Sequence, residues 1–248
     1  MALPKEDSLR KTAKRIRHVN HPKLPTSFED LPQVPAEYAT IGGDMWLCFD
    51  NGVNDDVRVI AFARRSTLSA MSNSTHWLMD GTFKSRPLIA AQLYVIHYHT
   101  NGHVLPGVFA LMSAKSEVAY GVLFEGIKGV LPEDRQDGPS RFSVDFELAA
   151  SKAMVTVFQG AAPSYCFFHF SQSMWRKLQE TGASADYLMP ANEELRAQFH
   201  AILALAFVPV NHVVQAFLLL QEHVDNRLDQ VTDRLEDCYV LGRRKGRG

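Results

Sequence analysis

The stretch AAQLYVIHYHTNGHVLPGVFALM, residues 90–112, contains two runs rich in β-branched and aromatic residues on either side of Asn101-Gly102. Runs of this composition are typical of β-strands. An Asn-Gly pair readily adopts the positive φ angles that a tight hairpin turn requires. The stretch therefore predicts an antiparallel hairpin, and this hairpin limits which folds the rest of the chain can adopt.

Strand and helix patterns alternate on both sides of this hairpin. Before it, residues 57–63 and 75–83 have the apolar composition of short strands, with a short helical or irregular connection between them. After it, apolar residues recur at helical spacing, and Ser116 can cap the first turn of that helix. The segments that follow are predicted as strand, helix, strand and helix, at residues 141–147, 148–160, 164–170 and 171–182.

This order of elements predicts an α/β fold. Three antiparallel strands followed by alternating helices and strands are the layout of a ribonuclease H-like mixed sheet. Beyond residue 183 the strand patterns end, and the remaining sequence predicts a C-terminal all-helical insertion. We therefore expect a basic, proline-punctuated and extended leader at 1–37, a ribonuclease H-like core at 38–182 and a helical insertion-like segment at 183–248.

The composition limits the classes of protein to consider. With 248 residues, 46% hydrophobic and 21% charged, the chain can bury a sizeable core, and its net charge of -1 gives no overall attraction to nucleic acid. No apolar run approaches the roughly 18 residues of a membrane span, so we expect no membrane partner. Cys48, Cys166 and Cys238 have neither a zinc-finger spacing nor that of a disulfide framework.

Both ends of the chain are basic. The C-terminal sequence is GRRKGRG, and residues 1–23 contain seven basic residues, namely Lys5, Arg10, Lys11, Lys14, Arg15, Arg17 and Lys23. Clusters of this kind either bind phosphates or are simply solvated. Our hypothesis is that these basic clusters bind DNA in a salt-sensitive and largely sequence-independent way.

Two aspartates occupy comparable places in this strand pattern. Asp80 lies near the end of the first strand of the meander, and Asp145 lies near the end of the fourth. In a ribonuclease H-like sheet these two strands are central neighbours, so the carboxylates would meet at one edge. Paired carboxylates repel unless a cation lies between them, and hard oxygen ligands suit Mg²⁺ or Mn²⁺. The pattern therefore predicts a Mg²⁺ or Mn²⁺ site at Asp80 and Asp145.

A structural role for each acid stays open. Asp80 precedes Gly81-Thr82 and could form a turn, while Asp145 with Glu147 could open a helix at the positive end of its dipole. Only the joint position of the aspartates on the first and fourth strands favours the metal site. Glu147 could then act as an outer-shell or alternate ligand.

In combination, these segments resemble the transposase domain of Mutator-like elements (MULEs) over about residues 57–245. The motifs are Asp-Gly-Thr-Phe at Asp80, Asp-Phe-Glu at Asp145, and Cys-x-x-His at Cys166 and His169. The resemblance implies a ribonuclease H-like DDE recombinase that acts on DNA in the nucleus, at the terminal inverted repeats of a transposon. It also implies that Asp80 and Asp145 are the first and second catalytic aspartates. A homo-oligomer is a further possibility.

The chain departs from this family in one respect. Family members place a third catalytic Glu after the helical insertion, and no counterpart is found in the expected sequence context among Glu194, Glu222 and Glu236. We therefore expect a transposase domain that is incomplete, with DNA cleavage and strand transfer that are weak or absent. The alternatives are a transposase-derived DNA-binding or interaction module without catalysis, and a decaying gene copy.

Two pairs of soft or borderline ligands remain. Cys166 and His169 could form half of a zinc site, but positions three apart on a strand point to opposite faces, which favours packing. His97 and His99 share a strand face and could bind a metal, or they could simply lie on the surface of the hairpin.

Overall fold

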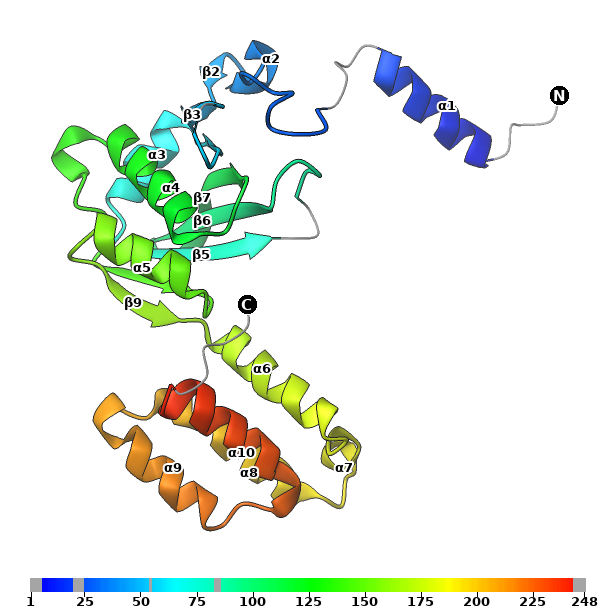
Figure 1. Ribbon diagram of the computed structural model, residues 1–248, viewed down its shortest axis with the longest axis vertical. Coiled ribbons are helices and arrows are strands. Elements are labelled where there is room, and N and C mark those ends of the chain that lie inside the picture. The colour runs from blue at the N-terminus through cyan, green and yellow to red at the C-terminus, as the bar shows by residue number, and fades with distance from the viewer. Residues whose placement is uncertain (1–5, 20–24, 54, 83–85, 243–248) are drawn as a thin grey trace.

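The computed structural model describes residues 6–19, 25–53, 55–82 and 86–242 (Figure 1). Its strands are β1 (Thr40–Ile41), β2 (Asp44–Met45), β3 (Leu47–Asp50), β4 (Val59–Phe62), β5 (His76–Thr82), β6 (Gln92–Thr100), β7 (His103–Met112), β8 (Arg141–Val144) and β9 (Ala162–Tyr165). Its α-helices are α1 (Glu6–Val19), α2 (Ala36–Ala39), α3 (Arg65–Ser72), α4 (Glu117–Val130), α5 (Leu148–Val157), α6 (Phe167–Glu180), α7 (Ser184–Leu188), α8 (Glu193–Ala204), α9 (Val213–Gln221) and α10 (Asp229–Leu235). A π-helical turn, η5 (Glu236–Val240), follows α10.

The main sheet has the strand order β3-β4-β7-β6-β5-β8-β9. Its strands pair antiparallel from β3 through β5, whereas β8 pairs parallel with both β5 and β9. The predicted hairpin between β6 and β7 is confirmed, because Asn101 and Gly102 have φ angles of 48° and 77°. The α/β class and the mixed sheet predicted from the sequence are thereby confirmed.

One face of the sheet is covered by α3, α4 and α5 (Figure 1). Trp77 on β5 is fully buried there, contacts Phe158 edge to face at 5.4 Å and donates from Nε1 to the carbonyl oxygen of Met71 at 3.1 Å. The cap predicted for α4 is also present, because the Ser116 side chain accepts from the backbone N–H of Ala119. These contacts make the sheet and the three helices one hydrophobic core.

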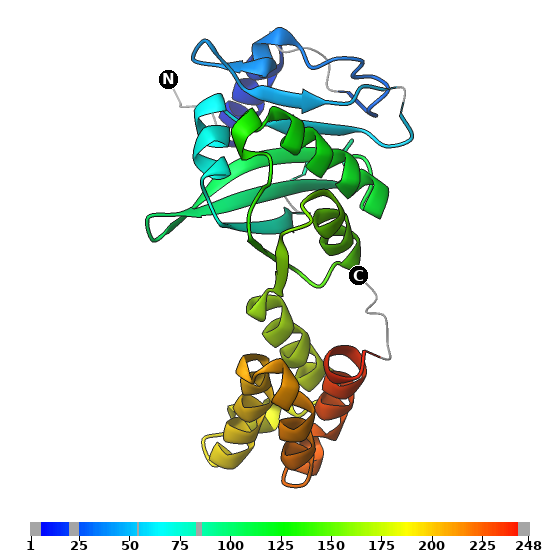
Figure 2. The same cartoon turned by 90° about the vertical axis from the view of Figure 1, so that its left-hand side faces the viewer.

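A second hydrophobic core lies among helices α6 to α10. Figure 2 shows α6 leading from the sheet into this helical lobe. Residues Phe170, Met174 and Leu178 of α6 are buried in it at i, i+4 and i+8 together with residues of α8 to α10, which is the periodicity of one helix face. The division into 1–37, 38–182 and 183–248 stays a prediction.

The strand predicted over residues 164–170 is wrong from Cys166 onward. β9 ends at Tyr165, and Cys166 is the N-cap of α6, with its backbone N–H donating to the carbonyl oxygen of Val144 at 2.8 Å. The aromatic composition favours a strand, but the apolar periodicity that begins at Phe170 requires a helix.

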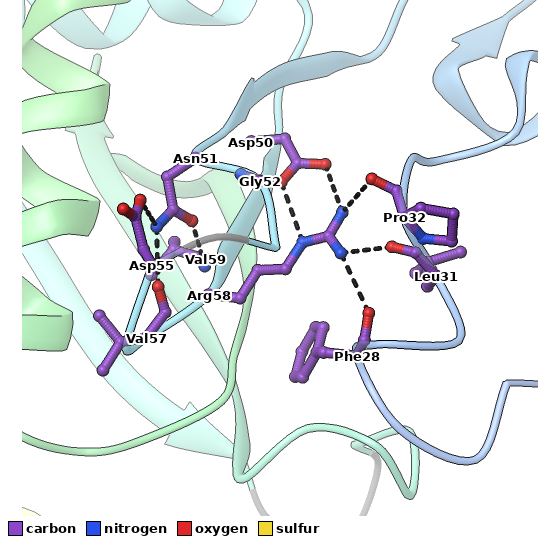
Figure 3. A network of polar contacts seen from close by, with 10 residues as sticks. All are labelled: Phe28, Leu31, Pro32, Asp50, Asn51, Gly52, Asp55, Val57, Arg58 and Val59. Carbon is purple, nitrogen blue, oxygen red and sulfur yellow. Dashed lines mark hydrogen bonds and ion pairs between the residues drawn. The ribbon is translucent and has the colours of Figure 1, made fainter.

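The N-terminal region also differs from the expected extended leader. α1 is a helix without Pro or Gly, and strong helix formers dominate its sequence. After α1, the segment that contains Phe28, Leu31 and Pro32 is held against the sheet by Arg58, which is 3% exposed (Figure 3). Its guanidinium donates to Asp50 at 2.8 and 3.1 Å and to the carbonyl oxygens of Phe28, Leu31 and Pro32.

Candidate active site

Asp80 lies within β5, and Asp145 directly follows the end of the neighbouring parallel strand β8. β5 and β8 pair in register, and the last pair is Leu78 with Ser143. Asp80 lies two residues after Leu78 within β5, and Asp145 lies two residues after Ser143, one residue beyond the end of β8. Adjacent strands lie about 4.8 Å apart, and a two-residue step restores the direction of the side chain. The sheet therefore brings the two aspartates together, as the sequence predicts.

Both carboxylates lie on the sheet face opposite α4 and α5. Trp77 and Met79 on β5, and Phe142 and Val144 on β8, are buried toward those helices. Side chains alternate along a strand, so the residues between and after them point to the other face. This alternation explains how a strand with a buried face can carry the exposed carboxylate of Asp80.

Burial, above all, raises the pKa of Asp145. The backbone N–H of Glu147, 3.2 Å from Oδ1 of Asp145, lowers this pKa, as does His169, while the negative charge of Asp80 raises it. The charge of Asp80 raises the pKa of Asp145 only because the two carboxylates are close to each other. The pKa of Glu147 is also raised, first by burial and then by Asp145.

The structural alternatives for the two acids have different outcomes. Asp80 is not in a turn, because it pairs with Val95 inside β5. Asp145 does accept a local hydrogen bond at the start of α5, whose N-cap is Glu147. Asp145 therefore has a structural contact in addition to its place beside Asp80, whereas turn formation does not account for Asp80.

A pocket of about 210 Å³ lies beside Asp80. It is lined by Leu78, Met79, Asp80, His97, Ser143, Val144, Cys166, Phe168 and His169. The expected opposite placement of Cys166 and His169 is wrong, because they are the N-cap and the third residue of α6 rather than strand residues. Residues three apart in a helical turn lie on the same side, which is why both reach this pocket.

Polar contacts connect the strands on the same face of the sheet. Nε2 of His76 lies 2.8 Å from Oγ of Ser143, which lies 2.7 Å from Oγ of Ser164. Arg141 lies 3.3 Å from Nδ1 of His76, and burial together with Arg141 and His99 lowers the pKa of that imidazole. These contacts tie β5, β8 and β9 together at the strands that carry the aspartates.

A buried polar group next to Glu147 is not among the features predicted from the sequence. Gln92 and Tyr94 on β6 and Tyr120 on α4 are nearly inaccessible to solvent, and Tyr120 donates to Oε2 of Glu147 at 2.8 Å. The signal was available, since Gln92 and Tyr94 have the same strand parity as buried Ile96. Burying a polar side chain is costly unless it finds a hydrogen-bond partner, as the amide nitrogen of Gln92 does in the hydroxyl of Tyr120.

The described residues contain no group of three or more His, Cys, Asp or Glu side chains arranged to hold a metal ion. His97 reaches the pocket beside Asp80, whereas His99 is exposed. Glu194, Glu222 and Glu236 do not line this pocket. The carboxylates of Asp80 and Asp145 are therefore the paired acids that the described part of the chain offers here.

The helical lobe nevertheless returns to the sheet next to Asp145. The ring of Tyr239 in η5 contacts Phe146 edge to face at 4.9 Å, and Phe146 stacks on Tyr165 at 5.1 Å. Tyr239 also contacts Phe170 of α6 at 5.0 Å. These aromatic rings join the two cores at the end of the strand that carries Asp145.

The fold and the site define an α/β protein with two carboxylates on adjacent central strands. Residues 76–173 of this chain match the family model of the MULE transposase domain, which confirms the resemblance to Mutator-like transposases over that range. No curated protein matches the chain. The matched range contains Asp80, Asp145, Cys166 and His169, and it is narrower than the expected 57–245. None of the described helices is long and apolar enough to cross a lipid bilayer.

Proposed function

We propose that this chain is the ribonuclease H-like DDE core of a MULE-type transposase, in which Asp80 and Asp145 bind Mg²⁺ or Mn²⁺ for DNA cleavage and strand transfer. The order β7-β6-β5-β8-β9, with β5 to β7 antiparallel and β8 and β9 parallel, supports the ribonuclease H-like assignment. The observation that carries the proposal is the parallel pairing of β5 with β8, because each aspartate lies two residues after the last paired residues, Leu78 and Ser143.

The donor chemistry fits a hard divalent cation. Both ligands are carboxylates, one exposed and one half-buried, and Asp145 is repelled by Asp80. When bound, such a cation lowers the pKa of a nucleophilic water or 3′-hydroxyl and stabilises the leaving oxygen of a phosphodiester. The exposure of Asp80 leaves room for a phosphate, while the N–H of Glu147 holds the carboxylate of Asp145 in place.

A second candidate function is a transposase-derived DNA-binding or interaction module without catalysis. The observation that favours it is that the described residues add no third ligand to the two aspartates. Loss of a charge-stabilising group in an active site costs roughly 10²–10³ in rate. The two candidates differ in whether the carboxylates bind a cation and cleave DNA.

The test is a Mn²⁺ titration followed by electron paramagnetic resonance, together with nicking of supercoiled plasmid DNA. We expect Asp145→Ala to weaken Mn²⁺ binding at least about tenfold and to abolish any nicking. Asp134→Ala, an acid with 82% side-chain exposure, is the control and keeps wild-type affinity. Equal Mn²⁺ affinity in all three proteins would refute the metal site, and Mn²⁺ binding without nicking would favour the second candidate.

For DNA we propose the terminal inverted repeats of a transposon as the partner, with the nucleus as the location and a homo-oligomer as the acting form. Of the basic N-terminal cluster, Arg10, Lys11 and Arg15 are exposed on α1, while Lys5, Lys23 and the C-terminal GRRKGRG from residue 243 onward lie outside the described residues. We expect DNA retention to weaken with salt and after deletion of both basic ends. Light scattering of the protein with and without DNA measures the oligomer.

A further inference from the structure

A chain of hydrogen bonds runs from the buried core to the site. Nε2 of Gln92 donates to the hydroxyl oxygen of Tyr120 at 2.8 Å, and the hydroxyl of Tyr120 donates to Oε2 of Glu147 at 2.8 Å. Gln92 and Tyr120 are both 0% exposed. These contacts connect β6, α4 and the start of α5, three elements distant in sequence.

Glu147 passes this anchoring on to Asp145. Its side chain is held by Tyr120, and its backbone N–H donates to Oδ1 of Asp145 at 3.2 Å. Glu147 is also the N-cap residue of α5, so the segment from 145 to 147 joins a strand to a helix. Fixing the Glu147 side chain therefore fixes the peptide N–H that orients the Asp145 carboxylate.

The polar chain is costly for a hydrophobic core. Burying an amide and a phenol requires that their hydrogen bonds be made, and apolar residues of similar size would pack without that requirement. The core around them is apolar, with the Tyr94 and Tyr120 rings in edge-to-face contact at 5.1 Å. Packing alone does not explain why Gln92 donates to the hydroxyl of Tyr120 and Tyr120 in turn donates to Glu147.

We propose that Tyr120 and Gln92 are positioning residues that hold Glu147 so that its backbone N–H fixes the carboxylate of Asp145. The assignment of Asp145 as a metal ligand rests on the proposed function, but the hydrogen-bonded arrangement itself does not. Partners that orient a metal ligand in this way typically contribute tenfold or more to metal affinity.

The first test measures amide hydrogen exchange of Glu147 in the metal-free protein. Tyr120→Phe removes the hydroxyl that holds Glu147, and we expect the Glu147 amide to exchange about tenfold faster because local opening becomes easier. Tyr94→Phe is a matched control, since its ring contacts Tyr120 but its buried hydroxyl makes no hydrogen bond among the described residues. Equal exchange in both variants would overturn the proposal.

The second test measures Mn²⁺ affinity of the whole chain by electron paramagnetic resonance. We expect Tyr120→Phe and Glu147→Ala each to weaken binding about tenfold, and the double variant to add no further loss. Glu147→Gln keeps an acceptor for Tyr120 and the same backbone N–H, so it should keep wild-type affinity. A loss in Glu147→Gln equal to that in Glu147→Ala would assign Glu147 a charge or ligand role and overturn the proposal.

The two tests separate this inference from the proposed function. Absence of Mn²⁺ binding in the wild-type protein refutes the metal site, while the exchange of the Glu147 amide still decides how Asp145 is held. Mn²⁺ binding that depends on Asp145 but not on Tyr120 refutes the positioning role and leaves the metal site intact. Circular dichroism of each variant confirms that the fold is retained.

Discussion

Replacement of Arg58 by Ala should destabilise the protein strongly. The guanidinium is 3% exposed and the carboxylate of its partner Asp50 is 16% exposed, so the pair is nearly desolvated (Figure 3). Removing one member of a buried ion pair costs about 3–5 kcal/mol, because the other charge is left unpaired. In this protein the carbonyl oxygens of Phe28 and Leu31 also lose their donor. We therefore expect the upper part of that range.

Arg58→Lys should recover only part of this loss. A lysine keeps the positive charge but offers a point donor in place of the planar fork that contacts Asp50 through two nitrogens. We expect a cost of about 2 kcal/mol, in the range of one hydrogen bond to a charged group. Glu180→Ala is the control, because its pair with Lys177 is 3.6 Å long with Glu180 68% exposed. That surface pair should contribute only about 0.3–0.5 kcal/mol.

The assay is thermal and urea unfolding of the four proteins at neutral pH. For a chain of this size, 1 kcal/mol corresponds to roughly 2–4 °C, so a loss of about 4–5 kcal/mol in Arg58→Ala should lower the unfolding temperature by about 8–20 °C. The region around Phe28 should also become sensitive to limited proteolysis, since its carbonyl accepts from Arg58. A loss below about 1 kcal/mol, or unchanged proteolysis, would refute the view that Arg58 anchors this segment.

Two further predictions concern the helices. Asp225 accepts hydrogen bonds from the side chain and backbone of Arg227, which lower its pKa to about 2. Because the pKa is depressed on folding, Asp225→Asn should cost about 1 kcal/mol above pH 4 in urea unfolding, and this difference should vanish as the pH falls toward 2; a pH-independent difference would contradict it. A Cβ at Gly126 would lie 2.6 Å from the Phe49 ring, so Gly126→Ala should destabilise by about 1–3 kcal/mol. Gly121→Ala on the same helix meets nothing within 4 Å and should stabilise by about 0.5–1 kcal/mol, and equal signs would contradict the packing argument.

Sequence reasoning predicts the sheet because its signals are local. These signals are the Asn101-Gly102 turn, the cap at Ser116 and the alternation of buried residues along β5 and β8. Each of them depends on only a few neighbouring residues. The sequence patterns do not predict the edge strand β3, because it is short and half-buried and is defined by its pairing with β4. Its assignment depends on tertiary contact, which local patterns do not encode.

The aspartate pair could be predicted for the same reason, since each residue is placed by its own strand. The contacts around it could not, because they join separate elements. Gln92 and Tyr120 are 28 residues apart, and their hydrogen bond depends on how α4 crosses β6. Cys166 and His169 were placed on the wrong element, because the aromatic run 165–170 satisfies both a strand and a helix pattern.

The local structure around Asp145 does not require a charge at that position. An asparagine could accept the same hydrogen bond from the Glu147 N–H and begin α5 equally well. The aspartate instead has a pKa raised by burial and by Asp80, so its ionisation above the unfolded pKa lowers the free energy of unfolding. A charge that destabilises the fold, and that a neutral isostere could replace, is typical of a functional site. Cation binding between Asp80 and Asp145 would offset this penalty, which is a physical argument in favour of the proposed metal site.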